Sequence, residues 1–267
     1  MKRYSQRVLH ASIVTLVCWI ILRIDPAGQI FNIPGLLIVV VGTVLATMMG
    51  HSFRGVADLL KALPNKLRHQ SEVNEVDMAL FVKVADYYRL ANIRFAELGA
   101  RRIETPLLRM GAQLVLDRTP SSDIDRTMQW KISAQRERDN GEILVFRNMM
   151  TLAPAFGMLG TLFGLIGMLY ELDSTAMQHI GESMGFAMLT TVYGLLMSNL
   201  VLKPVISRLE TNSRKRLAWM YVQAEAVMMM EEKCHSNVIQ DALLAFLDDP
   251  EISNPREELE LKAIRTS

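Results

Sequence analysis

The chain has 267 residues, half of them hydrophobic, and a formal net charge of +1 at pH 7. This balance does not favour nucleic acid as a partner. The two cysteines, Cys18 and Cys234, fall in an apolar and a charged segment, which argues against a disulfide and a Cys-based metal site.

Hydrophobic residues are concentrated in four segments. These are residues 8–24, 33–49, 149–172 and 184–205. A helix needs roughly 20 apolar residues to cross a bilayer, so the last two are long enough and the first two are near the minimum. The first follows three basic residues, as a signal peptide does, but no small-residue cleavage site follows it. We therefore predict four transmembrane helices and expect the first to be retained.

The basic residues predict the orientation. All Lys and Arg except Arg23 lie in the N-terminus, in residues 50–148 or after residue 202. Because basic residues are enriched on the cytoplasmic side of membranes, both termini and the long middle segment are predicted to be cytoplasmic.

Helical spacing of apolar residues extends through the middle segment, and no strand pattern competes with it. We expect helix breaks at Pro64 and Asn65, near Pro106 and at residues 119–122. One long helix is then expected from residue 123 to 172, and the fourth span is expected to continue past Pro204 to about residue 235, followed by a short amphipathic helix at 238–247 and a disordered tail.

The predicted protein is therefore all-α, a polytopic membrane protein with four transmembrane helices and a helical cytoplasmic domain. Four regions make up its organisation: residues 1–50, with a cytoplasmic stub and the first two spans; 51–147, the cytoplasmic helical domain; 148–205, the third and fourth spans with the ion path; and 206–267, a cytoplasmic helix and tail.

Small residues form a stripe along the third span. Gly157, Gly160, Gly164 and Gly167 follow one another at spacings of three, four and three. Transmembrane helices associate through small residues that let their backbones approach closely. The stripe is thus predicted to be a helix-packing surface.

Hydroxyl groups accompany the stripe. Thr161 lies beside it, and Thr190 and Thr191 lie in the fourth span, so two facing helices are able to line a narrow polar ion path. The alternative is that each hydroxyl bonds its own helix backbone and serves packing alone. No Asp, Glu, Lys, Arg or His occurs in residues 151–170 or 183–202. Since ion relays normally need an ionisable group at membrane depth, another chain is expected to supply it.

Two prolines stand at the cytoplasmic ends of these spans. Pro154 and Pro204 each remove a backbone hydrogen bond and are candidates for a moving joint, although prolines also occur in membrane helices for packing alone.

No catalytic motif is present in the sequence. It contains no phosphate-binding loop and no dinucleotide-binding glycine pattern, and its five histidines lack metal-ligand spacing. Neither an enzyme nor a cofactor or bound metal is expected.

Three segments carry a family resemblance. APAFGMLGTLFGL (residues 153–165), LTTVYG (189–194) with Pro204, and PGLLIVVVGTVLATMMG (34–50) resemble the MotA and PomA stator proteins of the bacterial flagellar motor, within the wider group of ExbB and TolQ. ExbB and TolQ have one span before the large cytoplasmic segment, whereas two spans are predicted there in this chain. This difference separates the chain from ExbB and TolQ.

The resemblance implies an inner-membrane pentamer around a dimer of a MotB-like or PomB-like partner, whose transmembrane Asp binds the ion. It further implies that Pro154 and Pro204 are the coupling prolines and that Thr161, Thr190 and Thr191 lie near the ion path. Thr161 matches a position that is Thr in sodium-driven members, which favours Na⁺ over H⁺ as the transported ion.

The resemblance also implies a contact with a FliG-like rotor protein. The family's Arg and Glu for this contact fall on Arg89 and Glu97, and three further arginines, Arg94, Arg101 and Arg102, are able to share or replace that role. The alternative is a solvated helix face.

The function predicted is that of an ion-conducting, torque-generating stator subunit in bacterial motility. Two alternatives are an ExbB/TolQ-like energy transducer that drives a non-flagellar process, and a non-conducting membrane scaffold. A peptidoglycan-binding domain in the partner favours motility, whereas a periplasmic domain that contacts an outer-membrane receptor favours the first alternative. Ion flux measured with and without the partner tests the second.

Overall fold

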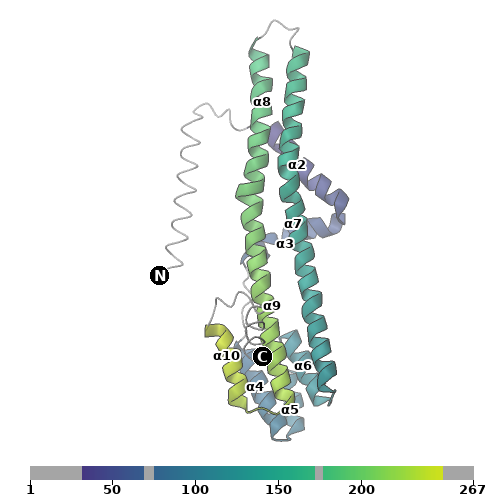
Figure 1. Cartoon of the computed structure of the whole chain (residues 1–267), viewed down its shortest axis with the longest axis vertical. Coiled ribbons are helices and arrows are strands. Elements are labelled where there is room, and N and C mark those ends of the chain that lie inside the picture. The colour runs from purple at the N-terminus through teal and green to yellow at the C-terminus, as the bar shows by residue number, and fades with distance from the viewer. Residues whose placement is uncertain (1–31, 69–74, 172–176, 249–267) are drawn as a thin grey trace, which may run out of the picture. The chain divides into compact units, whose positions relative to one another are not determined.

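The computed structural model describes residues 32–68, 75–171 and 177–248 (Figure 1). Every regular element in these ranges is helical. In chain order they are α2 (Ile33–Gly50), α3 (Phe53–Arg68), α4 (Glu75–Arg89), α5 (Ile93–Ala100), α6 (Pro106–Leu116), α7 (Ser121–Glu171), α8 (Met177–Leu196), the π-helix η1 (Met197–Leu202), α9 (Lys203–Glu231) and α10 (Ser236–Asp248). The predicted all-α class is thus confirmed for this part of the chain.

The chain divides into two compact units. We call residues 1–52 with 148–203 the span unit, and residues 53–147 with 204–267 the charged unit. Helix α7 contributes to both, because it passes residue 148 without interruption.

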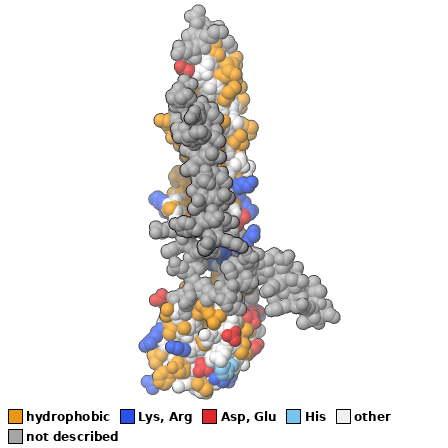
Figure 2. Space-filling model, turned by 90° about the vertical axis from the view of Figure 1, so that its left-hand side faces the viewer, with side chains coloured by type: hydrophobic (Ala, Val, Ile, Leu, Met, Phe, Trp, Pro, Cys, Tyr) orange, Lys and Arg blue, Asp and Glu red, His pale blue; other side chains and the backbone are white. Residues whose placement is uncertain are grey.

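Three helices among the described residues are long and apolar enough to cross a membrane: Ile33–Gly50, Ser121–Tyr170 and Ile180–Glu231. The first predicted span, residues 8–24, lies outside the described residues, as does the predicted disordered tail beyond residue 248. Large hydrophobic side chains such as Leu162, Phe163 and Leu200 are exposed on these helices, and Figure 2 shows mainly hydrophobic side chains on the described helices of the span unit. Such a surface is suited to lipid or to another apolar helix.

Local chemistry explains where α2 begins. The side chain of Asn32 accepts a hydrogen bond from the Gly35 N–H at 3.1 Å, and Pro34 occupies the first turn, where its missing N–H costs nothing. The Asn32 N–H in turn donates to the hydroxyl of Tyr193 in α8 at 2.8 Å. The start of α2 is therefore fixed to α8.

The predicted helix break at Pro64 is wrong. Helix α3 continues through Pro64 and ends at Arg68. Pro64 lies close to that end, and the side chain of Asn212 in α9 donates to the carbonyl of Lys66 at 3.2 Å. This bond satisfies one of the carbonyl groups that a helix leaves unpaired at its C-terminus, and it fixes the end of α3 to α9.

The other helix predictions are confirmed to within a few residues. Helix α6 begins at Pro106, α7 covers the predicted long helix, and α10 covers the predicted amphipathic helix. Asn140 and Gly141 do not interrupt α7. The fourth span does continue past Pro204, but through a π-helical segment that the sequence pattern did not indicate.

The charged unit has its own hydrophobic core. Helices α4, α5, α6, α7, α9 and α10 contribute to it, and its fully buried large side chains include Phe81, Leu108, Met128, Met230 and Leu243. Burial of this apolar surface drives the unit to fold.

Candidate functional site

The glycine stripe of α7 lies against α8 of the same chain. A Cβ atom placed on Gly160 would lie 2.5 Å from the Cβ of Thr190, and one placed on Gly164 would lie 2.7 Å from the Cβ of Ala187. Real Cβ atoms do not approach so closely, so α7 and α8 lie this near each other only because these positions lack side chains. Gly167 is less closely packed, since a Cβ placed on it would have the Ser183 hydroxyl oxygen as its nearest neighbour, at 3.7 Å.

Helix α8 contributes a matching glycine. A Cβ on Gly194 would lie 2.7 Å from the carbonyl oxygen of Ala153 and 3.2 Å from the Cα of Pro154, and a Cβ on Gly157 would lie 2.9 Å from the carbonyl oxygen of Thr190. The two helices therefore approach backbone to backbone next to Pro154.

The three threonines of the predicted path have different surroundings. Thr190 is fully buried, and its hydroxyl donates to the Ala187 carbonyl at 2.8 Å. Thr161 and Thr191 are only half-buried. The Thr161 hydroxyl donates to the Met158 carbonyl at 2.6 Å, which leaves the oxygen lone pairs free to accept a hydrogen bond or to contact a cation.

Two further threonines, which sequence reasoning missed, lie in α2. Thr43 and Thr47 are almost fully buried, and their hydroxyls donate to the carbonyls of Val39 and Thr43 in their own helix. Their spacing of four, continued back to Val39 and Gly35, forms the buried face of α2. That spacing was readable in the sequence.

Pro154 lies inside α7, which continues through it. Without an N–H, Pro154 cannot donate to the carbonyl of Met150, four residues earlier. The hydroxyl of Ser198, in η1, donates to this carbonyl at 2.9 Å. Sequence reasoning did not predict this bond, because the acceptor of the Ser198 hydroxyl lies on another helix.

Pro204 is exposed and is the second residue of α9, which begins at the end of η1. In η1 the N–H of Lys203 donates to the Ser198 carbonyl, five residues back rather than four. Single π-helical turns of this kind occur frequently at functional sites.

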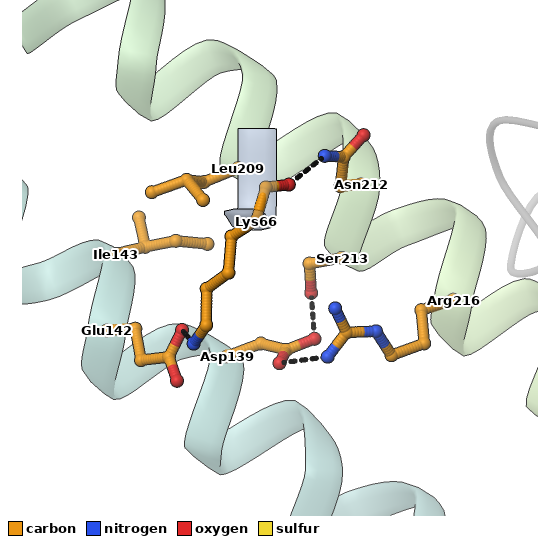
Figure 3. A pocket seen from close by; sticks show the side chains of 8 residues that line it. All are labelled: Lys66, Asp139, Glu142, Ile143, Leu209, Asn212, Ser213 and Arg216. Atoms are coloured by element: carbon orange, nitrogen blue, oxygen red, sulfur yellow. Dashed lines mark hydrogen bonds and ion pairs between the residues drawn. The ribbon is translucent and has the colours of Figure 1, made fainter. Parts of the chain in front are cut away.

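A polar cluster joins three helices of the charged unit (Figure 3). Asp139 of α7 is almost fully buried and accepts hydrogen bonds from Ser213 at 2.8 Å and from Arg216 at 3.2 Å, both in α9. Beside it, Lys66 of α3 pairs with Glu142 at 2.5 Å. Each charge in the cluster has an opposite partner, so the cluster is suited to joining helices rather than to attracting an ion.

The predicted rotor-contact residues lie on α4 and α5 and just after α5. Arg89 ends α4 and is engaged with Asp86 at 2.9 Å. Glu97, Arg94, Arg101 and Arg102 are exposed. Exposed apolar side chains, Leu90, Phe95 and Leu98, lie among them.

Asp77 of α4 holds the start of α6. Burial raises the pKa of Asp77, but hydrogen bonds from the Thr105 hydroxyl and from the N–H groups of Glu104 and Thr105, together with the charge of Arg109, outweigh this and lower the pKa below its ordinary value. The bonds to Thr105 are 2.5 Å from the hydroxyl and 2.7 Å from the N–H. Asp77 is therefore a charged joint between α4 and α6.

Within residues 32–68, 75–171 and 177–248, no group of three or more His, Cys, Asp or Glu side chains is placed to hold a metal ion.

Comparisons with known proteins agree on one family. Residues 99–221 match the family model described as the MotA/TolQ/ExbB proton channel family. The chain is 30% identical over 207 residues to the protein YtxD of Bacillus subtilis, covering 76% of this chain and 75% of that protein. It is 27% identical to motility protein A of Treponema phagedenis, covering 89% of this chain and 88% of that protein.

The fold matches a solved structure as well. The structure of MotAB from C. jejuni has a TM-score of 0.76 and 20% sequence identity, covering 91% of this chain and 96% of that one. This likeness concerns the fold. Taken with the sequence matches, it shows that the chain belongs to the MotA/TolQ/ExbB proton channel family and is a MotA-type member of it.

Proposed function

We propose that this chain is the ion-conducting, torque-generating subunit of a flagellar stator. The observation that carries the proposal is its membership of the MotA group together with spans that bear hydroxyl groups but no ionisable side chain at residues 151–170 and 183–202. Such spans are able to line an ion path yet need a carboxylate from another chain. The partner that we propose is a MotB-like subunit with a transmembrane Asp.

The proposed path runs beside Thr161 and Thr191. Both are half-buried, and the Thr161 oxygen has free lone pairs, so these hydroxyls are able to replace part of an ion's hydration shell. The complete burial of Thr190 against Gly160 supports a packing role for it instead.

The proposed cycle has four steps without covalent chemistry. The ion binds the partner's carboxylate beside Thr161 and Thr191, the carboxylate charge is neutralised, the two proteins shift relative to each other, and the ion leaves on the cytoplasmic side near Pro154. The membrane potential provides about 2.3 kcal/mol per elementary charge per 100 mV.

The proposed setting is the bacterial inner membrane, with both termini cytoplasmic, five copies of the chain around two copies of the partner, and a FliG-like rotor protein facing the charged unit. The exposed arginines, Arg94, Arg101 and Arg102, support an electrostatic contact with an acidic rotor surface. Either Na⁺ or H⁺ is the transported ion, and Thr161 favours Na⁺.

The experiment is deletion of the gene followed by complementation, with swimming speed measured at varied Na⁺ concentration and at varied pH. We expect the deletion to stop swimming and the wild-type chain to restore it. Ion flux into vesicles that hold the chain and its partner is measured in parallel. Normal swimming after deletion, with ion flux intact in vesicles, would assign the chain to a non-flagellar process. Absence of ion flux would indicate that the chain is a non-conducting membrane scaffold.

A further inference from the structure

In the interior of helix α7, one carbonyl group cannot be satisfied by the helix backbone in the usual way. The carbonyl of Met150 should accept from the N–H of residue 154, but Pro154 has no N–H. In an apolar environment a carbonyl without a partner is costly, so a substitute donor is expected.

The structure supplies that donor from another helix. The Ser198 hydroxyl lies 2.9 Å from the Met150 oxygen, and Ser198 is only 6% exposed. Three threonine hydroxyls of the span unit behave differently, since those of Thr43, Thr161 and Thr190 donate to carbonyls of their own helices. A serine in a helix ordinarily has the same option, so the bond to α7 is a specific feature of this position.

A second, independent contact lies one turn away. Gly194 precedes Ser198 by four residues and so shares its face of the helix. A Cβ on Gly194 would lie 3.2 Å from the Cα of Pro154. One face of α8 and η1 therefore contacts α7 at the proline itself and at the carbonyl that the proline leaves free.

We propose that Ser198 is a positioning residue whose hydroxyl replaces the missing N–H of Pro154 and thereby holds the third span against the fourth at the coupling joint. Its role in coupling rests on the proposed function, whereas the hydrogen bond itself does not. Because the bond joins two helices instead of two turns of one helix, a shift of α7 against α8 near Pro154 has to lengthen or break it.

The test is a cycle of four proteins: wild type, Ser198→Ala, Pro154→Ala and the double variant, each purified as the full chain in detergent micelles. Hydrogen–deuterium exchange is followed in peptides that cover residues 148–158. In the presence of Pro154 we expect Ser198→Ala to speed exchange about fivefold, since one net hydrogen bond is lost. In the Pro154→Ala background, where residue 154 gains an N–H that donates to the Met150 carbonyl, we expect Ser198→Ala to change exchange little.

Two further variants serve as controls. Ser198→Thr keeps the hydroxyl and is expected to retain slow exchange. Thr43→Val removes a buried hydroxyl whose acceptor, the Val39 carbonyl, keeps its backbone donor within α2. Its effect is therefore expected to be the same in the wild-type and the Pro154→Ala backgrounds. An equal effect of Ser198→Ala in both backgrounds would overturn the proposal, because it would reduce Ser198 to a packing residue.

A motor measurement separates the two proposals. We expect Ser198→Ala to be inserted and recruited to motors at the wild-type level but to give lower torque on a tethered bead. Unchanged torque, despite coupling in the exchange cycle, would overturn the role of Ser198 in motion and leave the proposed function intact. If the wild-type chain drives no motor at all, the proposed function fails, and the exchange cycle still decides whether Ser198 replaces the donor.

Discussion

Gly160 and Thr190 lie in direct contact between α7 and α8, and the side chain of Thr190 fills the space where Gly160 has none. The contact is between two helices of one chain. Gly157, Gly160 and Gly164 of the stripe therefore form a packing surface within the span unit itself.

We expect Gly160→Ala to destabilise the chain by about 1–3 kcal/mol, the usual cost of an added carbon in a filled interior. Gly141→Ala is the matched control, because Gly141 also lies within α7 and nothing lies within 4 Å of its added Cβ. That change is expected to be neutral or slightly stabilising. Thermal unfolding in detergent measures both, and equal melting temperatures for the two variants would show that α7 and α8 do not pack along the stripe.

We expect Gly160→Leu to be inserted but to lose its oligomeric state, because the larger side chain separates α7 from α8 and deforms the unit that has to assemble. Native mass measurement of the variant, beside the wild type, reports the oligomer. An unchanged oligomer would mean that assembly does not depend on this contact.

We expect Thr161→Ala to raise the ion concentration needed for half-maximal swimming about tenfold, since one oxygen that contacts the ion is lost. Thr161→Ser keeps that oxygen and should behave like the wild type. Thr211→Ala removes a hydroxyl with the same bonding, to the Ser207 carbonyl at 2.8 Å, but lies in the charged unit and should have no effect. If Thr161→Ala also swam normally at limiting ion concentration, the path would have to lie elsewhere.

We expect single charge reversals at Arg94 or Arg101 to weaken rotor engagement slightly and the double reversal to weaken it severely. Exposed ion pairs contribute about 0 to 1 kcal/mol each, so the contact acts as a sum over several arginines. Arg136→Glu with Arg138→Glu, on α7, makes the same change of net charge and is the control. Recruitment of a fluorescent fusion to motors measures engagement, and equal loss in both double variants would indicate a general effect of charge.

We expect the stability contribution of Asp77 to depend on pH. Its folded-state pKa is lowered, so the carboxylate stabilises the fold at pH values above the unfolded pKa of about 3.9, and the stabilisation is lost as pH falls through the lower, folded pKa. Asp77→Asn should therefore cost about 1–3 kcal/mol at pH 7 and little at the most acid pH that can be measured. Asp241→Asn, at an exposed position in α10, is the control. A cost of Asp77→Asn that stays constant with pH would contradict the assignment.

Periodicity alone predicted most of the helices, because apolar residues recur at helical spacing along the buried face, no matter which element the helix packs against. The long helix α7 is an example. It was predicted to continue through Asn140 and Gly141, although these two residues interrupt the apolar pattern. Pro64 misled the prediction, since α3 continues through it to Arg68, where Asn212, a residue far away in the sequence, bonds the carbonyl of Lys66 near the helix end.

Contacts between helices were the main information that the sequence did not contain. The spacing of Gly157, Gly160 and Gly164 indicated close packing, but only the structure shows that the partner is α8 of the same chain. In the same way the sequence shows that Ser198 is a hydroxyl-bearing residue of the fourth span, but its bond depends on the position of Met150. The π-helix η1 was also not predicted, because no residue pattern marks a bond to the fifth residue back.

The central claim is that ion flow through this chain and its partner turns a rotor. The most direct measurement is the rotation of a bead attached to a flagellum, in cells that lack their own stators, while the chain and its partner are induced. We expect torque to rise in discrete steps as units join the motor, and to fall to zero when the ion gradient is collapsed. A bead that stays still while the chain is present at motors, or one that turns at the same torque without the gradient, would contradict the claim.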